Sequence, residues 1–217
     1  MKKNFFALLH TMKLVVLLPT LSVSLVACEP ENDEEGVPVD LGLSVKWASC
    51  NVGAESLEDY GNYYAWGGTS PTKTYYESDC VTYDLSFSEL ESHGIIDSDG
   101  NLNPKYDAAT ANWGSAWRMP TREELDELRD RCTWSMITVK GVQGYKVKGP
   151  SGNAIFLPAA GYRLDTSLSY EGSRGSYWSS TYSSEGSRAY ELTFSSYGYE
   201  RGESRRNCGY TVRPVLK

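Results

Sequence analysis

The amino-acid sequence predicts an α+β domain in which short helices precede a run of short, mostly antiparallel strands. Three observations support this class. A complete helix-capping pattern follows Pro120, a hairpin pattern surrounds residues 150–153, and segments of strand character continue to residue 216. Helices and strands that occur in separate blocks favour α+β architecture over a regular alternation of the two.

The first part of the domain offers few strong elements. Apolar residues alternate at a period of two within residues 37–47, which predicts an opening strand. Residues 70–92 are mostly polar and predict a loop, with a short helix around 87–90. A tight turn is predicted at 95–102 and a short Ala-rich helix at 106–113.

The clearest helix signal begins at Thr121. Its hydroxyl can accept a hydrogen bond from the main-chain N–H of Glu124, while the Glu124 carboxylate reaches back to the N–H of Thr121. Leu125, Leu128 and Cys132 would then lie on one face of the helix.

Strands are predicted after this helix. Residues 144–148 and 154–158 flank the turn sequence Pro-Ser-Gly-Asn at 150–153, a combination that predicts a hairpin. The later strand candidates are residues 177–180, 188–194 and 211–216.

Residues 1–27 have the pattern of a signal peptide. Lys2 and Lys3 precede apolar residues, and the stretch 14–27 is short of the roughly 20 residues of a membrane-spanning helix. Leu-Val-Ala-Cys at its end reads as a lipobox, which predicts that Cys28 is lipidated and becomes the first residue after cleavage. An ordinary signal peptide followed by a free cysteine is the alternative.

Residues 28–36 are predicted to form a tether before the domain at 37–217. Five of the seven residues at 29–35 are acidic and none is a large apolar residue, so this segment cannot fold alone. It resembles the acidic export signal of surface lipoproteins from Bacteroides-type bacteria. That resemblance implies an outer-membrane location facing outward, and a plain spacer is the alternative.

Composition limits the partners of the chain. The formal net charge of −7 and the lack of a basic stripe argue against nucleic acid and against docking on anionic lipid. Cys50, Cys80, Cys132 and Cys208 have no CxxC spacing, so two disulfides with three possible pairings, or free thiols, both remain open. Only His93 remains after residue 27, which makes a zinc site improbable.

Several ordered motifs resemble known families. Residues 117–125 resemble a segment of formylglycine-generating-enzyme-like domains, a branch of the C-type-lectin-like fold. The wider set resembles the Fibrobacter succinogenes major paralogous domain family over nearly all of residues 38–217. Its motifs here are residues 40–48, 63–67, 106–109, 157–163, 177–180 and 212–215. The resemblance implies a C-type-lectin-like fold with the N- and C-terminal strands adjacent, which would place residues 212–216 beside 41–47.

The resemblance does not carry an activity with it. Formylglycine-generating enzymes use two cysteines close in sequence near the C-terminal end, whereas here Cys208 has no neighbour nearer than Cys132. A catalytic triad would depend on His93 alone, in a polar loop. The sequence therefore predicts no enzyme; a diverged oxidase of that type survives only if two cysteines meet beside a cleft.

No cofactor or metal is predicted. Asp97 begins a string that resembles a calcium loop, but its sixth position is Leu102 where Gly is needed, and its twelfth is Ala108 where Glu is needed. A plain Asp-Gly turn explains the string. Glu29-Pro30, which resembles part of a lectin calcium motif, lies in the predicted tether.

Residues 167–210 have the composition of a binding surface. Ser, Tyr, Gly and Arg make up 30 of these 44 residues. Antibody binding surfaces use the same mixture, because Tyr gives stiff contact area and Arg gives forked donors. The alternative is that surface loops of β-rich proteins often have this composition. The predicted ligand-binding residues are Tyr170, Arg174, Tyr182, Arg188, Tyr197, Tyr199, Arg201, Arg205 and Arg206.

Residues 197–207 also resemble the variable segment of retroelement-diversified C-type-lectin-like proteins, which precedes a fixed last strand. The function expected from the sequence is therefore an outer-membrane surface lipoprotein that binds a glycan, a protein or another cell surface without catalysis. It would contact the membrane only through the lipid on Cys28. A structural or adhesin-like surface subunit without a small ligand is the alternative.

Overall fold

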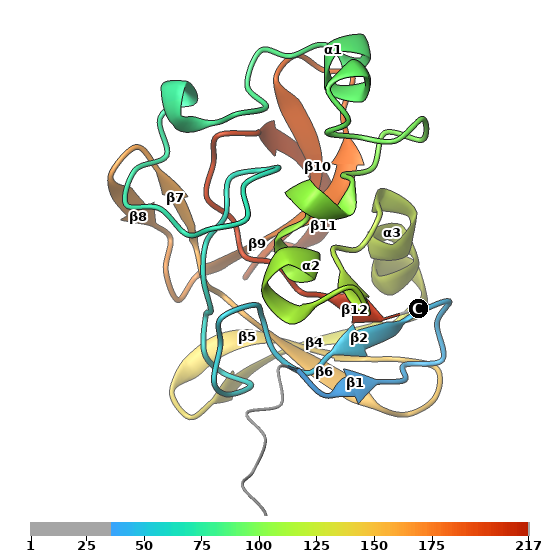
Figure 1. Ribbon diagram of the computed structural model, residues 1–217. Coiled ribbons are helices and arrows are strands. Elements are labelled where there is room, and N and C mark those ends of the chain that lie inside the picture. The colour runs from blue at the N-terminus through green and yellow to red at the C-terminus, as the bar shows by residue number, and fades with distance from the viewer. Residues whose placement is uncertain (1–35, 217) are drawn as a thin grey trace, which may run out of the picture. The chain divides into compact units, whose positions relative to one another are not determined.

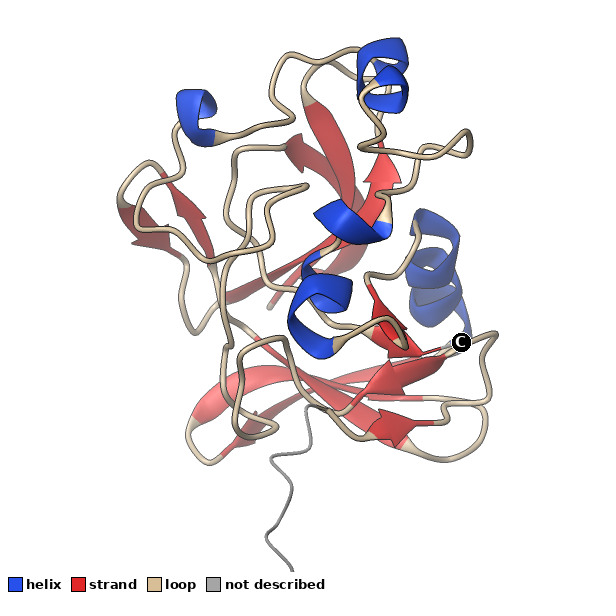
Figure 2. Ribbon diagram, viewed as in Figure 1, coloured by secondary structure: helices blue, strands red, loops and turns tan. Residues whose placement is uncertain are grey.

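Short antiparallel strands make up most of the regular structure (Figures 1 and 2). The structure is a computed structural model that describes residues 36–216. The predicted signal peptide, Cys28 and nearly all of the predicted tether lie outside the described residues. The compact unit that contains the described residues is Glu34–Lys217.

The strands fall into several small sheets. One sheet has the strand order β1-β2-β12-β3, in which neighbours are hydrogen-bonded. The other three sheets have the orders β11-β10-β9, β4-β5-β6 and β7-β8. The strands are β1 Pro38–Val39, β2 Lys46–Ala48, β3 Trp117–Arg118, β4 Thr133–Val139, β5 Val142–Lys148, β6 Ala154–Pro158, β7 Tyr162–Leu164, β8 Ser167–Ser169, β9 Arg174–Tyr182, β10 Arg188–Ser195, β11 Gly198–Arg205 and β12 Val215–Leu216.

The helices are short and occupy little of the chain. They are η1 Glu77–Asp79, α1 Phe87–Ser92, η2 Pro104–Tyr106, α2 Ala108–Trp113 and α3 Arg122–Arg131, where η marks a 3-10 helix. Among residues 36–216, none is long and apolar enough to cross a membrane.

The predicted fold class is wrong. Two strands precede the first helix, α1 and α2 have only six residues each, and four small sheets replace a helices-first C-type-lectin-like arrangement. The expected closeness of the first and last strands is limited to two residue pairs, in which Val215 faces Trp47 and Leu216 faces Lys46. The sequence signal missed β4 and β11, and these two strands complete the two largest hairpins.

The hairpin predicted around residues 150–153 is confirmed. Strands β5 and β6 pair from Gly144 with Pro158 to Lys148 with Ala154. The turn closes through the N–H of Gly149, which donates to the Asn153 carbonyl over 2.9 Å. The opening strand is shorter than predicted, because residues 40–45, with bends at 42–45, separate β1 from β2.

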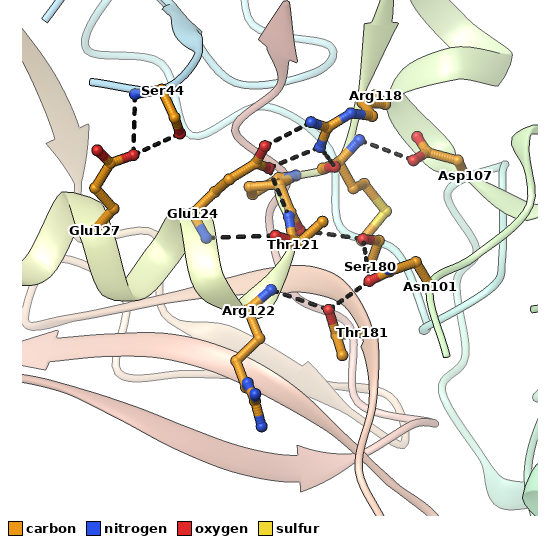
Figure 3. A network of polar contacts seen from close by, with 12 residues as sticks. Ser44, Asn101, Asp107, Arg118, Thr121, Arg122, Glu124, Glu127, Ser180 and Thr181 are labelled. Atoms are coloured by element: carbon orange, nitrogen blue, oxygen red, sulfur yellow. Dashed lines mark hydrogen bonds and ion pairs between the residues drawn. The ribbon is translucent and has the colours of Figure 1, made fainter. Parts of the chain in front are cut away.

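The predicted cap of α3 is also confirmed, and it belongs to a wider polar network (Figure 3). The Glu124 main-chain N–H donates to the Thr121 hydroxyl over 3.3 Å, and the Thr121 N–H donates to the Glu124 carboxylate over 2.8 Å. Arg118 also donates to that carboxylate, over 2.7 Å, and the Arg122 N–H donates to the Thr181 hydroxyl in β9 over 2.9 Å. The network therefore joins the start of α3 to β9, as the figure shows, and Cys132 ends the helix in an extended conformation.

The sheet β9-β10-β11 contributes to two separate hydrophobic clusters. Ala189 and Trp178 belong to one cluster, which also contains Trp66. Leu192 and Phe194 belong to the other. Because side chains alternate between the two faces of a strand, one strand serves both clusters.

The four cysteines within residues 36–216 do not form disulfides. Cys50, Cys80, Cys132 and Cys208 are free thiols, and all but Cys132 are buried. The sequence left disulfides and free thiols both possible, and the structure shows free thiols.

Candidate functional site

An open hollow of about 310 Å³ lies at the turn end of the β10-β11 hairpin. Both polar and aromatic side chains line it, together with a glycine that leaves space. The lining residues are Arg174, Thr193, Phe194, Ser195, Tyr197, Gly198, Tyr199 and Glu200. They come from all three strands of one sheet and from one turn, so the register of the sheet positions the hollow.

The hairpin turn places Tyr197 in solvent. Ser195 pairs with Gly198, so only Ser196 and Tyr197 connect the strands. The Ser195 hydroxyl accepts a hydrogen bond from the Tyr197 N–H over 3.2 Å. Gly198 has φ +135°, a conformation that favours glycine. The Tyr197 side chain is 100% exposed, so it is free to contact a ligand.

Arg174 forms the cationic side of the hollow. Its Nε donates to the Thr193 hydroxyl over 2.9 Å, and the Thr193 hydroxyl donates to the Gly175 carbonyl over 3.2 Å. The guanidinium carbon lies 5.7 Å from the ring centroid of Tyr162. These contacts hold the guanidinium in place while about a third of the side chain stays accessible.

An aromatic pair extends from Arg174 over the surface. The rings of Tyr162 and Tyr170 are stacked, with centroids 5.8 Å apart. Tyr170 has φ +58°, which is rare for a bulky residue, and its side chain is 60% exposed. The main-chain carbonyl of Tyr170 accepts hydrogen bonds from the N–H groups of Ser173 and Arg174, which hold this loop. Arg174 is therefore linked through the half-buried ring of Tyr162 to the exposed ring of Tyr170.

A buried carboxyl group lies beside the hollow. Glu191 is only 4% exposed, and its Oε1 lies 3.9 Å from Nη2 of Arg174. Its Oε2 has no hydrogen-bond partner within the described residues. Burial raises the pKa of Glu191 to about 7, and the charge of Arg174 opposes that rise. Gly202 of β11 lies opposite Glu191 of β10. A side chain at position 202 would come close to the Glu191 carboxylate.

We expect Glu191 to make the protein less stable as the pH rises from about 4.5 to about 7. The folded state raises the pKa of this carboxyl above its unfolded value, so the folded protein holds the proton more tightly in that range. Unfolding free energy should fall by about 3 kcal/mol between these two values, at 1.36 kcal/mol per pKa unit. Urea unfolding of wild type and Glu191→Gln over this pH range tests it.

The Gln variant should lack this part of the pH dependence, because it cannot ionise. Glu185→Gln, at an exposed position outside the sheet, is the matched control and should follow the wild type. Parallel pH curves for wild type and Glu191→Gln would contradict the expectation.

The structure brings some predicted ligand-binding residues together. Arg174, Tyr197 and Tyr199 line the hollow, and Tyr170 reaches it through Tyr162. Tyr199 also stacks on Trp134 with ring centroids 4.4 Å apart, which anchors the hollow to β4.

Other predicted residues lie elsewhere. Arg201 forms an ion pair with Asp126 of α3 over 2.7 Å, and Arg188 donates to the main-chain carbonyl of Glu203 over 3.1 Å. Arg205 lies 3.4 Å from the Glu77 carboxylate, beside a second hollow of about 390 Å³. Tyr182 is half-buried and packs edge-on against Phe87 at 5.5 Å. None of these residues lines the hollow.

Arg206 is not a surface residue, so its predicted role in ligand binding is wrong. Its side chain is fully buried and donates to four main-chain carbonyls, those of Thr82, Leu85, Gly186 and Arg188. The guanidinium also lies over the rings of Trp66 and Tyr182, at 5.4 and 4.9 Å. Arg206 therefore holds the fold together from inside.

Sequence reasoning missed Thr193, Glu200 and Glu191. The alternation in the predicted strand 188–194 offered a signal, since Glu191 and Thr193 share a face with the apolar Ala189. A carboxyl group within such a strand is unusual and indicates a special environment. In the part of the chain that the structure describes, no three His, Cys, Asp or Glu side chains cluster as metal ligands do.

Comparisons with known proteins give a family but no activity. One protein-family model matches residues 67–215, and its description is a domain of unknown function. No curated protein and no solved structure matches the chain.

Proposed function

Because the chain belongs to the family of domains of unknown function named DUF8237, whose description gives no activity, we propose a function from the hollow itself. The domain is a non-enzymatic binding module that recognises a glycan at the turn end of the β10-β11 hairpin. The observation that carries the proposal is the fully exposed Tyr197 next to the polar hollow that holds Arg174 and Glu200.

The chemistry of the hollow suits a polyhydroxylated ring. Arg174 supplies hydrogen-bond donors, Glu200 supplies acceptors, and the hydroxyls of Thr193 and Ser195 supply both. Sugar hydroxyls are donors and acceptors at once, so they can satisfy such a mixed lining. The apolar face of the sugar ring can then lie on Tyr197, because an aromatic ring offers a flat apolar surface with a polar tip.

The open shape favours one or two sugar units of a longer chain over an enclosed small molecule. A volume of about 310 Å³ is at the lower end for small-molecule sites. Beyond the hollow, the contact surface continues from Arg174 to the ring of Tyr162 and on to the ring of Tyr170. A further unit of an oligosaccharide can rest there.

We expect Tyr197→Ala and Arg174→Ala each to weaken oligosaccharide binding about tenfold or more, which corresponds to about 1.4 kcal/mol. The unit Glu34–Lys217 would be titrated with a panel of cello-, chito-, manno- and galacturono-oligosaccharides by calorimetry. Trp134 fluorescence gives a second readout, since Trp134 stacks on Tyr199 at the hollow.

Tyr76→Ala is the matched control, because Tyr76 is 44% exposed and does not line this hollow. It should bind as the wild type does. Absence of binding across the panel, or equal affinities for all variants, would reject the glycan proposal. Binding of a protein partner by the same surface is a separate reading, supported by its Tyr, Ser and Arg content.

The setting of the module is also part of the proposal. The lipobox and acidic tether support an outer-membrane lipoprotein that faces outward, and the resemblance to the major paralogous domain family supports the same setting. We expect Cys28→Ser to abolish incorporation of a tagged fatty acid in growing bacteria. Cys132→Ser should retain the label, and a labelled Cys28→Ser protein would contradict the lipoprotein assignment.

A further inference from the structure

A buried carboxyl group lies next to the cationic side chain of the hollow. Glu191 is 4% exposed, whereas about a third of the Arg174 side chain, which lines the hollow, is accessible. The distance from Glu191 Oε1 to Arg174 Nη2 is 3.9 Å, which is about 1 Å longer than a charge-assisted hydrogen bond. Glu191 Oε2 has no hydrogen-bond partner within the described residues. The carboxyl group is therefore close to Arg174 without being hydrogen-bonded to it.

Arg174 is the one cation among the groups that surround this carboxyl group. The titratable and charged groups that face Glu191 are Arg174 on β9, Glu200 on β11, and Cys208 and Tyr210 after β11. Burial raises the pKa of Glu191 to about 7, the charge of Arg174 opposes that rise, and the charge of Glu200 adds to it. The carboxyl group therefore gains and loses its proton close to neutral pH.

We propose that the proton on Glu191 controls whether the Arg174 guanidinium faces the hollow or the protein interior. The protonated carboxyl group carries no charge, so it leaves Arg174 available to a ligand in the hollow. An ionised carboxyl group that is buried without a partner is costly. On ionisation the guanidinium therefore moves about 1 Å inward and donates the missing hydrogen bond to Glu191, and the hollow loses its cationic donor.

The contacts of Arg174 allow a movement of this size. Its Nε donates to the Thr193 hydroxyl over 2.9 Å, whereas within residues 36–216 neither terminal nitrogen donates a hydrogen bond. The guanidinium can therefore tilt while Nε stays fixed to β10. Glu191 and Thr193 lie two residues apart on that strand, so their side chains share a face. The tilt brings the terminal nitrogens toward the carboxylate without loss of the bond to Thr193.

The consequence for ligand affinity rests on the proposed function of the hollow. A sugar hydroxyl or carboxylate that accepts from Arg174 binds the form in which Glu191 is protonated, so affinity falls as the pH rises. With the pKa of Glu191 at about 7, the protonated fraction falls from about nine-tenths at about pH 6 to about one-tenth at about pH 8. If only that form binds, affinity falls about tenfold over this range.

A measurement without ligand tests the control of Arg174 directly. The Nε–Hε signal of Arg174 would be followed by NMR on isotope-labelled protein from about pH 5.5 to about pH 8.5, and identified by its loss in Arg174→Lys. In the wild type we expect the signal to shift with a midpoint near the pKa of Glu191. In Glu191→Gln it should keep its low-pH position throughout, because the amide cannot ionise.

Glu185→Gln is the matched control for the NMR titration, because Glu185 is exposed and lies outside the sheet. Its Arg174 signal should titrate as in the wild type. A wild-type signal that does not move over this range would overturn the proposal. The same shift in Glu191→Gln would also overturn it, since another group would then control Arg174.

Affinity measured at two pH values tests the consequence for binding. Calorimetry with the same oligosaccharide panel at about pH 6 and about pH 8 should show binding to the wild type that weakens by about three- to tenfold. Glu191→Gln should keep its low-pH affinity at both values. Equal wild-type affinities would overturn the coupling and leave the binding function in place. Absence of binding at both values would reject the binding function, and the NMR titration decides the control of Arg174 in either case.

Discussion

Replacement of Arg206 by methionine is expected to lower the free energy of unfolding by about 3 to 5 kcal/mol, at the high end for a single substitution. The change leaves the carbonyls of Thr82, Leu85 and Gly186 without their donor inside the protein, while the Arg188 carbonyl keeps its 3.3 Å hydrogen bond from the Ser183 N–H. Each unsatisfied buried acceptor costs about 1 to 3 kcal/mol. Loss of the buried charge offsets part of that sum, since burial lowers the pKa of this guanidinium.

Arg205→Met is the matched control for this prediction. Arg205 is the adjacent residue, its side chain is 60% exposed, and it forms one long ion pair with Glu77. Its replacement should cost at most about 1 kcal/mol. Urea unfolding of both variants measures the difference. An equal loss of unfolding free energy in the two variants would show that the hydrogen bonds of Arg206 do not stabilise the fold as expected.

Arg213→Met is expected to have an effect of similar size, about 3 to 5 kcal/mol, with a different local consequence. Arg213 is 1% exposed and donates to the main-chain carbonyls of Ala48, Ser49 and Phe156 and to the side chain of Asn51. It therefore joins the end of β2 to β6. Without it, main-chain hydrogen exchange in Lys46–Ala48 should speed up more than exchange in β10.

Arg131→Met is the control here, because Arg131 is half exposed and forms a surface pair with Glu127 on α3. It should leave exchange in β2 unchanged. Uniform acceleration of exchange throughout the domain in Arg213→Met would mean that the side chain supports the whole fold equally, contrary to the expectation.

Local patterns were the part of the fold that the sequence predicted well. The Thr121–Glu124 cap involves residues three apart, and the hairpin depends on one turn sequence, so neighbouring residues determine both. Strand β11 was missed because Gly198, Glu200 and Glu203 have low strand propensity. Its pairing with all eight residues of β10 overrides that propensity.

The candidate site depended on contacts distant in sequence, and composition could not resolve them. Composition pointed to residues 167–210, but it did not separate Arg174, which lines the hollow, from Arg206, which is buried. The two adjacent arginines 205 and 206 show why. Arg205 is the last residue of β11 and is exposed, whereas Arg206 begins the turn that follows and its side chain is buried.

The two-residue turn at Ser196-Tyr197 has a consequence for how this protein can change over time. A shift of β10 by one residue would exchange Glu191 with Leu192 and disturb both hydrophobic clusters. The strands are thus closed to insertions, whereas the turn residues are exposed and belong to neither cluster. Mutations at the turn should therefore cost almost no stability. If the hollow binds a glycan as proposed, the turn is where new specificities can evolve.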